Sequence, residues 1–195
     1  MTSSDLVGAL SPVINALEGL GVPHYVGGSV ASSVHGVPRA SVDADVVADL
    51  QPEHVAPFVT GLAGSYYLDA DRISAAVQAR RSFNVIHLVT LFKIDVFVAK
   101  ARPFDREALK RARLEALEDS PQARRFRVAS PEDTILAKLE WFRAGGETSE
   151  RQWTDVVGVL RAVSDAVDVA YLRRWGQSIG VEDLLEKALR DAGGP

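Results

Sequence analysis

The stretch VGGSVASSVHGVPRASVDADVV, residues 26–47, decides the fold of this chain because it leads from a glycine turn to an acidic strand. Side chains in a strand alternate between two faces, so Asp43 and Asp45 share one face while Ala44 and Val46 share the other. Two neighbouring carboxylates on a rigid element repel each other unless a cation lies between them. The pair therefore predicts either a solvated strand face or a site for a hard divalent cation such as Mg²⁺.

A third carboxylate lies in the middle of another apolar strand, KIDVFVAK, residues 93–100. Ile94 and Val96 occupy one face of this strand, and Asp95 shares the other face with Lys93. A carboxylate in a largely buried strand needs either a salt bridge, here from Lys93 or Arg81, or a metal ion. Three strand-borne carboxylates are the ligands that a two-metal phosphoryl-transfer centre requires.

Gly27, Gly28 and Ser29 follow an expected strand and precede an expected short helix. Glycines at such a turn let the backbone approach a phosphate closely, and the N-terminus of the next helix offers free N–H groups. The turn by itself is common, but it lies one short helix before the acidic strand. The stretch therefore predicts a phosphate-binding turn beside a pair of carboxylates.

The remaining pattern predicts a small α/β (α+β) core with a mixed sheet over residues 1–129 and a helical C-terminal subdomain over 130–195. The expected elements are a helix beginning at Ser11–Pro12, a strand at 23–28, a helix at 29–36, a strand at 41–50, a helix after Gln51–Pro52, a short strand at 65–69, a helix over 73–77, a hairpin over 82–100 turning near Thr90, a charged helix at 104–117, a strand at 124–129, and helices from a cap at Ser130 onward.

The composition is that of an ordinary globular protein, with 195 residues, 47% hydrophobic residues and a formal charge of −4. The absence of cysteine excludes disulfides, thiolate metal sites and cysteine nucleophiles, and it agrees with a cytoplasmic protein. The uncharged run at 19–38 is too polar for a membrane span, so no membrane partner is expected. The window 100–127 is locally basic; it suits either a nucleic-acid backbone or a helix with a solvated charged face.

The opening stretch resembles the DNA polymerase beta-like nucleotidyltransferase superfamily, within it the minimal nucleotidyltransferases and the abortive-infection-type toxins. The resemblance covers roughly residues 22–160, and the segment 82–100 is similar to the one that bears the third carboxylate of the family. The helical segments after Ser130 are similar to the C-terminal part of the family. The matching residues are Gly36, Arg39, Ser41, Asp43, Asp45, Asp95, Lys138 and Asp155.

The resemblance implies a nucleotidyltransferase that uses a nucleoside triphosphate and Mg²⁺, with Mn²⁺ as an alternative. It assigns catalysis and metal binding to Asp43, Asp45 and Asp95, and nucleotide or phosphate binding to Gly27, Gly28, Ser29, Arg39 and Lys138, with Asp155 as a site residue of the helical subdomain. The acceptor stays open between an RNA end such as that of tRNA, a protein hydroxyl and an aminoglycoside-like molecule. An antitoxin is the implied protein partner.

Other interpretations of the same residues remain open. Arg39 suits a structural salt bridge, and Lys138 suits a solvated helix surface. The DADVV motif also fits a haloacid-dehalogenase-type phosphatase, in which Asp43 would be the nucleophile. A further alternative is that the chain is a non-catalytic nucleotide-binding or partner-binding module on the same fold.

Overall fold

The computed structural model describes residues 3–36, 38–164 and 166–193. Its elements in chain order are α1 (Ser3–Gly19), β1 (His24–Val26), α2 (Gly28–His35), β2 (Asp43–Ala48), α3 (Pro52–Leu62), β3 (Tyr66–Tyr67), α4 (Ala70–Gln78), β4 (Ser82–His87), β5 (Lys93–Val98), α5 (Pro103–Arg111), β6 (Arg113–Ala116), β7 (Arg125–Val128), α6 (Pro131–Ala144), α7 (Glu150–Ala162), α8 (Val169–Ser178) and α9 (Glu182–Asp191). The strands of the described chain form one mixed sheet in the order β3-β4-β5-β2-β1-β7-β6.

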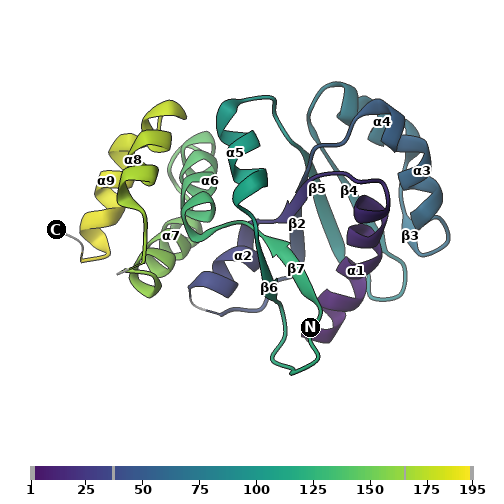
Figure 1. Cartoon of the computed structure of the whole chain (residues 1–195), viewed down its shortest axis with the longest axis horizontal. Helices are drawn as coiled ribbons and strands as arrows, with labels where there is room; N and C mark the ends of the chain where they lie inside the picture. The colour runs from purple at the N-terminus through teal and green to yellow at the C-terminus, as the bar shows by residue number, and fades with distance from the viewer. Residues whose placement is uncertain (1–2, 37, 165, 194–195) are drawn as a thin grey trace.

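The helices lie in two groups along the molecule (Figure 1). Helices α1, α3 and α4 cover one half of the sheet, and their apolar residues share a core with the apolar face of β2 and β5. Helices α6 to α9 gather at the opposite end of the molecule, where the C-terminus lies. None of the helices in the described ranges is long and apolar enough to cross a membrane.

The pairing of the central strands fixes which side chains lie next to one another. Strand β2 runs parallel to β5, and Asp45 is directly opposite Asp95. Strand β4 runs antiparallel to β5 and places Asn84 opposite Asp95 on the other side. The alternate residues Ala44 and Ile94 are fully buried, as the sequence predicted for the apolar face. One face of the sheet is therefore core, and the other carries a polar row that crosses three strands.

A second hydrophobic cluster lies between the C-terminal helices. Phe104 of α5 also belongs to it, so one helix from the first 129 residues contributes to this core. Its other fully buried members include Ile135, Leu136, Leu139, Val156, Val159, Leu172, Val181, Leu185 and Ala188. The division of the chain after residue 129 stays a prediction.

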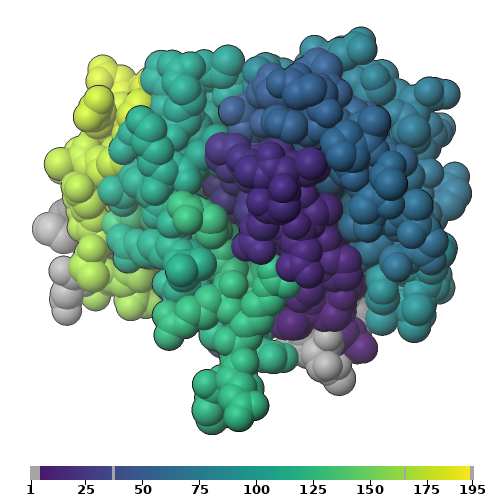
Figure 2. All heavy atoms as spheres, turned by 45° about the vertical axis from the view of Figure 1, so that its right-hand side comes forward, coloured from purple at the N-terminus to yellow at the C-terminus, as the bar shows by residue number. Residues whose placement is uncertain are grey.

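The expected helix over 104–117 is wrong in its second half. Helix α5 ends at Arg111, and the chain leaves the helical conformation at Ala112 to form β6, which pairs antiparallel with β7. Local charge patterning favoured a helix, but the open edge of β7 offers main-chain partners that the sequence pattern does not reveal. The connection between β6 and β7 projects from the body of the molecule (Figure 2).

The first helix begins earlier than expected. Helix α1 starts at Ser3 and continues through Pro12, so Ser11 is not its N-cap. Ala9 and Leu10 are fully buried, and packing of the turns before Pro12 outweighs the loss of one helical hydrogen bond at the proline. The Ser11 hydroxyl instead donates to the carbonyl of Val7, 2.7 Å away.

The expected cap at Ser130 is confirmed, and it belongs to a buried charged network. The Ser130 hydroxyl accepts a hydrogen bond from the Asp133 N–H at 3.1 Å. Arg111 pairs with Glu132 at 2.8 Å and with Asp133 at 3.5 Å, while the Tyr171 hydroxyl donates to Asp133 at 2.6 Å. Burial raises the pKa of Asp133 in spite of the hydrogen bonds from Tyr171 and Ser130. Arg111 thus supplies the counter-charge for two carboxylates that are almost fully buried.

We expect Arg111→Met to lower the free energy of unfolding by about 2 to 4 kcal/mol, because it leaves two buried carboxylates without their cation. Arg113→Met, at an exposed position of the edge strand β6, is the matched control and should change it by less than about 0.5 kcal/mol. Urea unfolding of both variants measures the difference. Equal stability of the two variants would show that the network does not depend on Arg111.

Candidate active site

The three carboxylates predicted from the sequence lie on the same face of neighbouring strands. Asp43 and Asp45 come from β2, and Asp95 comes from β5. The Lys93 ammonium lies 2.6 Å from an Asp95 oxygen and 3.7 Å from an Asp43 oxygen. The hydrogen bond that Lys93 donates to Asp95, together with the charges of the aspartates, raises the pKa of Lys93. The salt bridge to Asp95 considered from the sequence is therefore present, and Lys93 rather than Arg81 makes it.

Asp45 is the carboxylate with the most perturbed pKa in this group. Burial raises its pKa to about 6, and the charges of Asp43 and Asp95 add to the shift, while Lys138 and Lys93 oppose it. A carboxylate that is partly buried between two like charges is destabilised when it ionises. The face therefore holds more negative charge around Asp45 than its lysines compensate.

The glycine turn lies directly against Asp45. The Gly27 N–H donates to the Asp45 carbonyl at 2.8 Å, and Gly28 begins α2 with a positive φ of 56°. A Cβ atom on Gly28 would lie 1.6 Å from an Asp45 carboxylate oxygen, so only glycine fits at this position. No side chain caps the N-terminus of α2, and the Ser29 hydroxyl bonds with that of Ser41 at 2.5 Å. The phosphate-binding turn and the acidic strand predicted from the sequence are thus in contact.

Asp155 lies on α7, where it binds two cations. Arg39 donates to both oxygens of Asp155 at 3.2 and 2.9 Å, and Lys138 donates to one of them at 2.8 Å. Burial alone would raise the pKa of Asp155, but the hydrogen bonds from Arg39 and Lys138 outweigh it and lower the pKa. The salt-bridge reading of Arg39 is therefore correct. Lys138 is 8% exposed, which rules out a solvated helix surface.

Two further side chains near the face that carries Asp43, Asp45 and Asp95, the acidic face, were missed by the sequence reasoning, namely Asn84 and Trp141. Asn84 lies opposite Asp95. Trp141 of α6 packs with ring centroids 5.5 Å apart against Phe97, which the alternation of β5 places on the same face as Asp95. The position of Asn84 depends on the register in which β4 pairs with β5. The spacing of three residues between Lys138 and Trp141 is the sequence signal that could have placed both on one side of a helix.

Among the described residues, no group of three or more His, Cys, Asp or Glu side chains is close enough to form a metal site. The Lys93 ammonium forms ion pairs with both Asp43 and Asp95, so these two carboxylates already share one positive charge. Asp43 and Asp45 are left as a pair of hard oxygen ligands. Such a pair suits Mg²⁺ when substrate phosphates complete the coordination.

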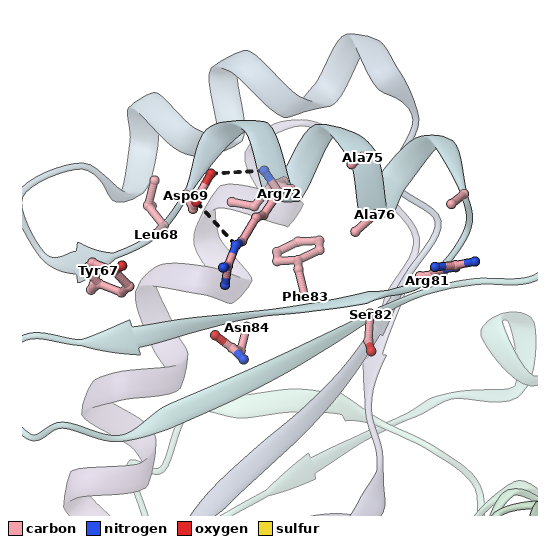
Figure 3. Close-up of a pocket in the computed structure, with 12 residues that line it drawn as sticks. Tyr67, Leu68, Asp69, Arg72, Ala75, Ala76, Arg81, Ser82, Phe83 and Asn84 are labelled. Carbon is pink, nitrogen blue, oxygen red and sulfur yellow. Dashed lines mark hydrogen bonds and ion pairs between the residues drawn. The ribbon is translucent and has the colours of Figure 1, made fainter.

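Two hollows flank this region. One, of about 570 Å³, lies between α4 and β4 and is lined by residues that include Arg72, Phe83 and Asn84 (Figure 3). The other, of about 820 Å³, lies between α2 and α7 and is lined by residues that include Arg39 and Asp155. Neither of these two hollows is lined by Asp43, Asp45 or Asp95.

The basic window at 100–127 is neutralised in part by ion pairs. Four of its nine basic residues form ion pairs within the described chain, namely Lys100, Arg102, Arg111 and Arg124. Arg102 contacts both Asp105 and Glu140. Contact of this window with a nucleic-acid backbone stays a prediction.

Comparisons with known proteins were informative at the level of structure only. No model of a known protein family matches the sequence, and no curated protein matches it. The solution structure of the antibiotic-resistance factor ANT(2'')-Ia is similar over 97% of this chain and 100% of that chain, with a TM-score of 0.56 and 17% identity. The crystal structure of ANT(2'')-Ia in complex with adenylyl-2''-tobramycin is similar over 89% of this chain and 98% of that chain, with the same score and identity.

A putative nucleotidyltransferase from Thermotoga maritima is similar over 80% of this chain and 96% of that chain, with a TM-score of 0.49 and 14% identity. At such identities a likeness concerns the fold, and the likeness to ANT(2'')-Ia covers nearly the whole length of both chains. A mixed sheet, a glycine turn against an acidic strand and a helical C-terminal part are the features that the opening motif indicated. The chain has a nucleotidyltransferase-type fold.

Proposed function

We propose that this protein transfers a nucleoside monophosphate from a nucleoside triphosphate to a hydroxyl acceptor, with Mg²⁺ or Mn²⁺ as the cofactor. The observation that carries the proposal is the contact between the Gly28 turn and Asp45, which in turn lies in register with Asp95. In this arrangement the turn at Gly27, Gly28 and Ser29, here called the phosphate cradle, would bind the phosphates. Asp45 would bind the metal ion, and Asp95 supplies a further carboxylate beside it.

The triphosphate would bind at the N-terminus of α2. Backbone N–H groups at this end carry a partial positive charge and lack a side-chain cap. The Ser29 hydroxyl adds one donor, and the missing Cβ of Gly28 lets the Asp45 carboxylate lie directly against the turn. Lys138 acts on Asp45 electrostatically and would stabilise the same phosphates, while Arg39 is held by Asp155 and supports the position of Lys138.

Asp43 and Asp45 would hold the metal ion, whose contribution is to neutralise charge on the phosphates. The fit rests on the hard oxygen ligands of the pair, which share one face of β2. Binding of a second ion at Asp95 requires the Lys93 ion pair to open.

The acceptor hydroxyl would attack the α-phosphorus, the bond from this phosphorus to the bridging oxygen would break, and pyrophosphate would leave toward α2. The proton of the hydroxyl passes to the Asp95 carboxylate. The Asp95 side chain is 21% exposed, so an acceptor can reach it from solvent. The attacking hydroxyl oxygen and the leaving pyrophosphate oxygen would lie on opposite sides of the α-phosphorus, as an in-line displacement requires.

The acceptor classes that we propose to compare are an RNA end, including that of tRNA, a protein hydroxyl and an aminoglycoside. The resemblance to toxin-type relatives supports the first, and the adenylyl-2''-tobramycin bound to ANT(2'')-Ia motivates the last. The proposal places the reaction in the cytoplasm, where nucleoside triphosphates are available. An antitoxin that covers the acidic face is the proposed protein partner.

The direct test is incubation with each α-³²P-labelled nucleoside triphosphate, Mg²⁺ and, separately, total RNA, total protein or an aminoglycoside. The wild-type protein should label one acceptor class, and the double variant Asp43→Ala/Asp45→Ala should lose at least about 10³-fold of the rate, because both metal ligands are gone. Identical behaviour of the two proteins across all acceptors would refute the enzymatic proposal and favour a binding module. Hydrolysis of a simple phosphate ester that is lost in Asp43→Asn would favour the phosphatase instead.

Gly28→Ala tests the phosphate cradle. Its Cβ would overlap an Asp45 oxygen, so we expect transfer to fall by at least about 10²-fold as the carboxylate is displaced. Gly64→Ala is the matched control, because Gly64 also has a positive φ, of 82°, but has open space around its Cβ. Both variants should lose about 1 kcal/mol of stability from backbone strain, and Gly64→Ala should keep its activity. Equal activity of the two variants would contradict the cradle.

The raised pKa of Asp45 predicts a pH dependence of stability. The stability that protonated Asp45 contributes is fully present below its ordinary pKa of 3.8 and is lost as the pH rises through about 6. Asp45→Asn should therefore gain about 1 to 3 kcal/mol over the wild type on going from pH 4 to pH 7.5 without metal.

Unfolding curves in urea at several pH values measure this difference. At pH 7.5, Mg²⁺ should raise the Tm of the wild type, which binds it in the folded state, and leave Asp45→Asn almost unchanged. A constant difference between the two proteins across the pH range would show that Asp45 is not electrostatically strained.

A further inference from the structure

An exposed tryptophan lies beside the acidic face, and the proposed chemistry leaves it without a role. Trp141 of α6 is 54% exposed. Its ring packs edge to face against Phe97 of β5, with centroids 5.5 Å apart and planes at 64°. A large exposed aromatic side chain that is held in place by a second ring is suited to stack on a planar ligand.

The position of this pair relative to Asp95 is fixed by the strand. Phe97 follows Asp95 by two residues, so the two side chains share a face and lie about 7 Å apart along β5. Lys138 lies one turn before Trp141 on α6 and acts on Asp45. Trp141 and Phe97 therefore border the carboxylates on the side of β5.

This side is opposite to the phosphate cradle. In the proposed reaction pyrophosphate leaves toward Gly28 and α2, which adjoin β2 and β1. An in-line transfer requires the attacking hydroxyl to come from the other side of the α-phosphorus, which is the side of Asp95 and β4. A ligand on Trp141 would thus be the acceptor and not the donor nucleotide.

Neutral polar side chains lie next to the two rings. Ser82 is opposite Phe97 and Asn84 is opposite Asp95, and both are exposed. Figure 3 shows Ser82 and Asn84 projecting away from α4, on the side of the sheet opposite to Phe83. These hydroxyl and amide groups can bond to the edge of a base or to a ribose.

We propose that Trp141, supported by Phe97, is a stacking platform for the terminal nucleoside of the acceptor and presents its hydroxyl to Asp95. A flat aromatic surface flanked by neutral hydrogen-bonding groups matches the face and the edge of a nucleobase, whereas a sugar offers no π-face to stack on the ring. This inference rests on the proposed function and names the acceptor-binding residue of the same site.

The test uses the fluorescence of Trp141 in the double variant Trp153→Phe/Trp175→Phe, in which it is the only tryptophan. The probes are a non-hydrolysable ATP analogue with Mg²⁺, single-stranded RNA hexamers, and methyl α-glucopyranoside. We expect the hexamers to quench the fluorescence and the ATP analogue and the glycoside to leave it nearly unchanged. Quenching by the ATP analogue alone, by the glycoside alone, or by none of the probes overturns the proposal. If the double variant does not fold, the difference between wild type and Trp141→Phe reports the same signal.

Kinetics provide the second readout. Trp141→Ala should raise the KM for the labelled acceptor by about 5- to 150-fold and leave the KM for the triphosphate within about threefold. Trp141→Phe should restore most of the loss. Tyr67→Ala is the matched control, since Tyr67 is 65% exposed on the short strand β3 and lies away from Asp95 in the sheet. If Trp141→Ala leaves the KM for the acceptor unchanged, the proposal that Trp141 stacks on the acceptor is wrong.

Failure of the platform and failure of the proposed function give different results. If the protein is not a nucleotidyltransferase, neither the wild type nor Asp43→Ala/Asp45→Ala transfers label to any acceptor. If only the platform is wrong, that double variant loses donor binding while the fluorescence of Trp141 does not respond to RNA.

Discussion

Burial of the Asp45 carboxylate among like charges is the constraint around which this part of the structure is arranged. Asp43 precedes it on β2, and parallel pairing of β2 and β5 places Asp95 directly opposite it. Lys93 compensates Asp95, but Asp45 keeps a pKa raised to about 6. A surface of this kind stabilises a bound cation because the cation removes a cost that the folded chain already carries.

The C-terminal helices contribute to the same balance of charge. Asp155 binds Arg39, which follows α2, and Lys138 of α6, so one carboxylate links three parts of the chain. Removing the charge of Asp155 would leave Arg39 and Lys138 without this partner, and Lys138 acts on Asp45. The helical part thus supports the electrostatics of the acidic face as well as forming its own core.

Prediction from the sequence succeeded where local patterns and the fold agree. The alternation of apolar and polar residues at 43–48 and 93–98 correctly predicted which side chains of β2 and β5 are buried. Ser130 correctly predicted the start of α6. It failed at 104–117, where pairing with β7 overrode a helical pattern, and at α1, where burial of Leu10 extended the helix past a proline. Asn84 and Trp141 were missed because their positions depend on strand register and helix packing.

The sequence by itself determined that a glycine turn, a short helix and a pair of aspartates follow one another, because these features depend on residues that are close in the chain. The tertiary structure decided that Gly28 contacts the side chain of Asp45, that Asp95 lies opposite it, and that Lys93 rather than Arg81 pairs with Asp95. It also decided that Asp155 holds Arg39 and Lys138 instead of joining the acidic face. These contacts join residues far apart in the chain, and only the packing of strands and helices brings them within the few ångströms over which charges and hydrogen bonds act.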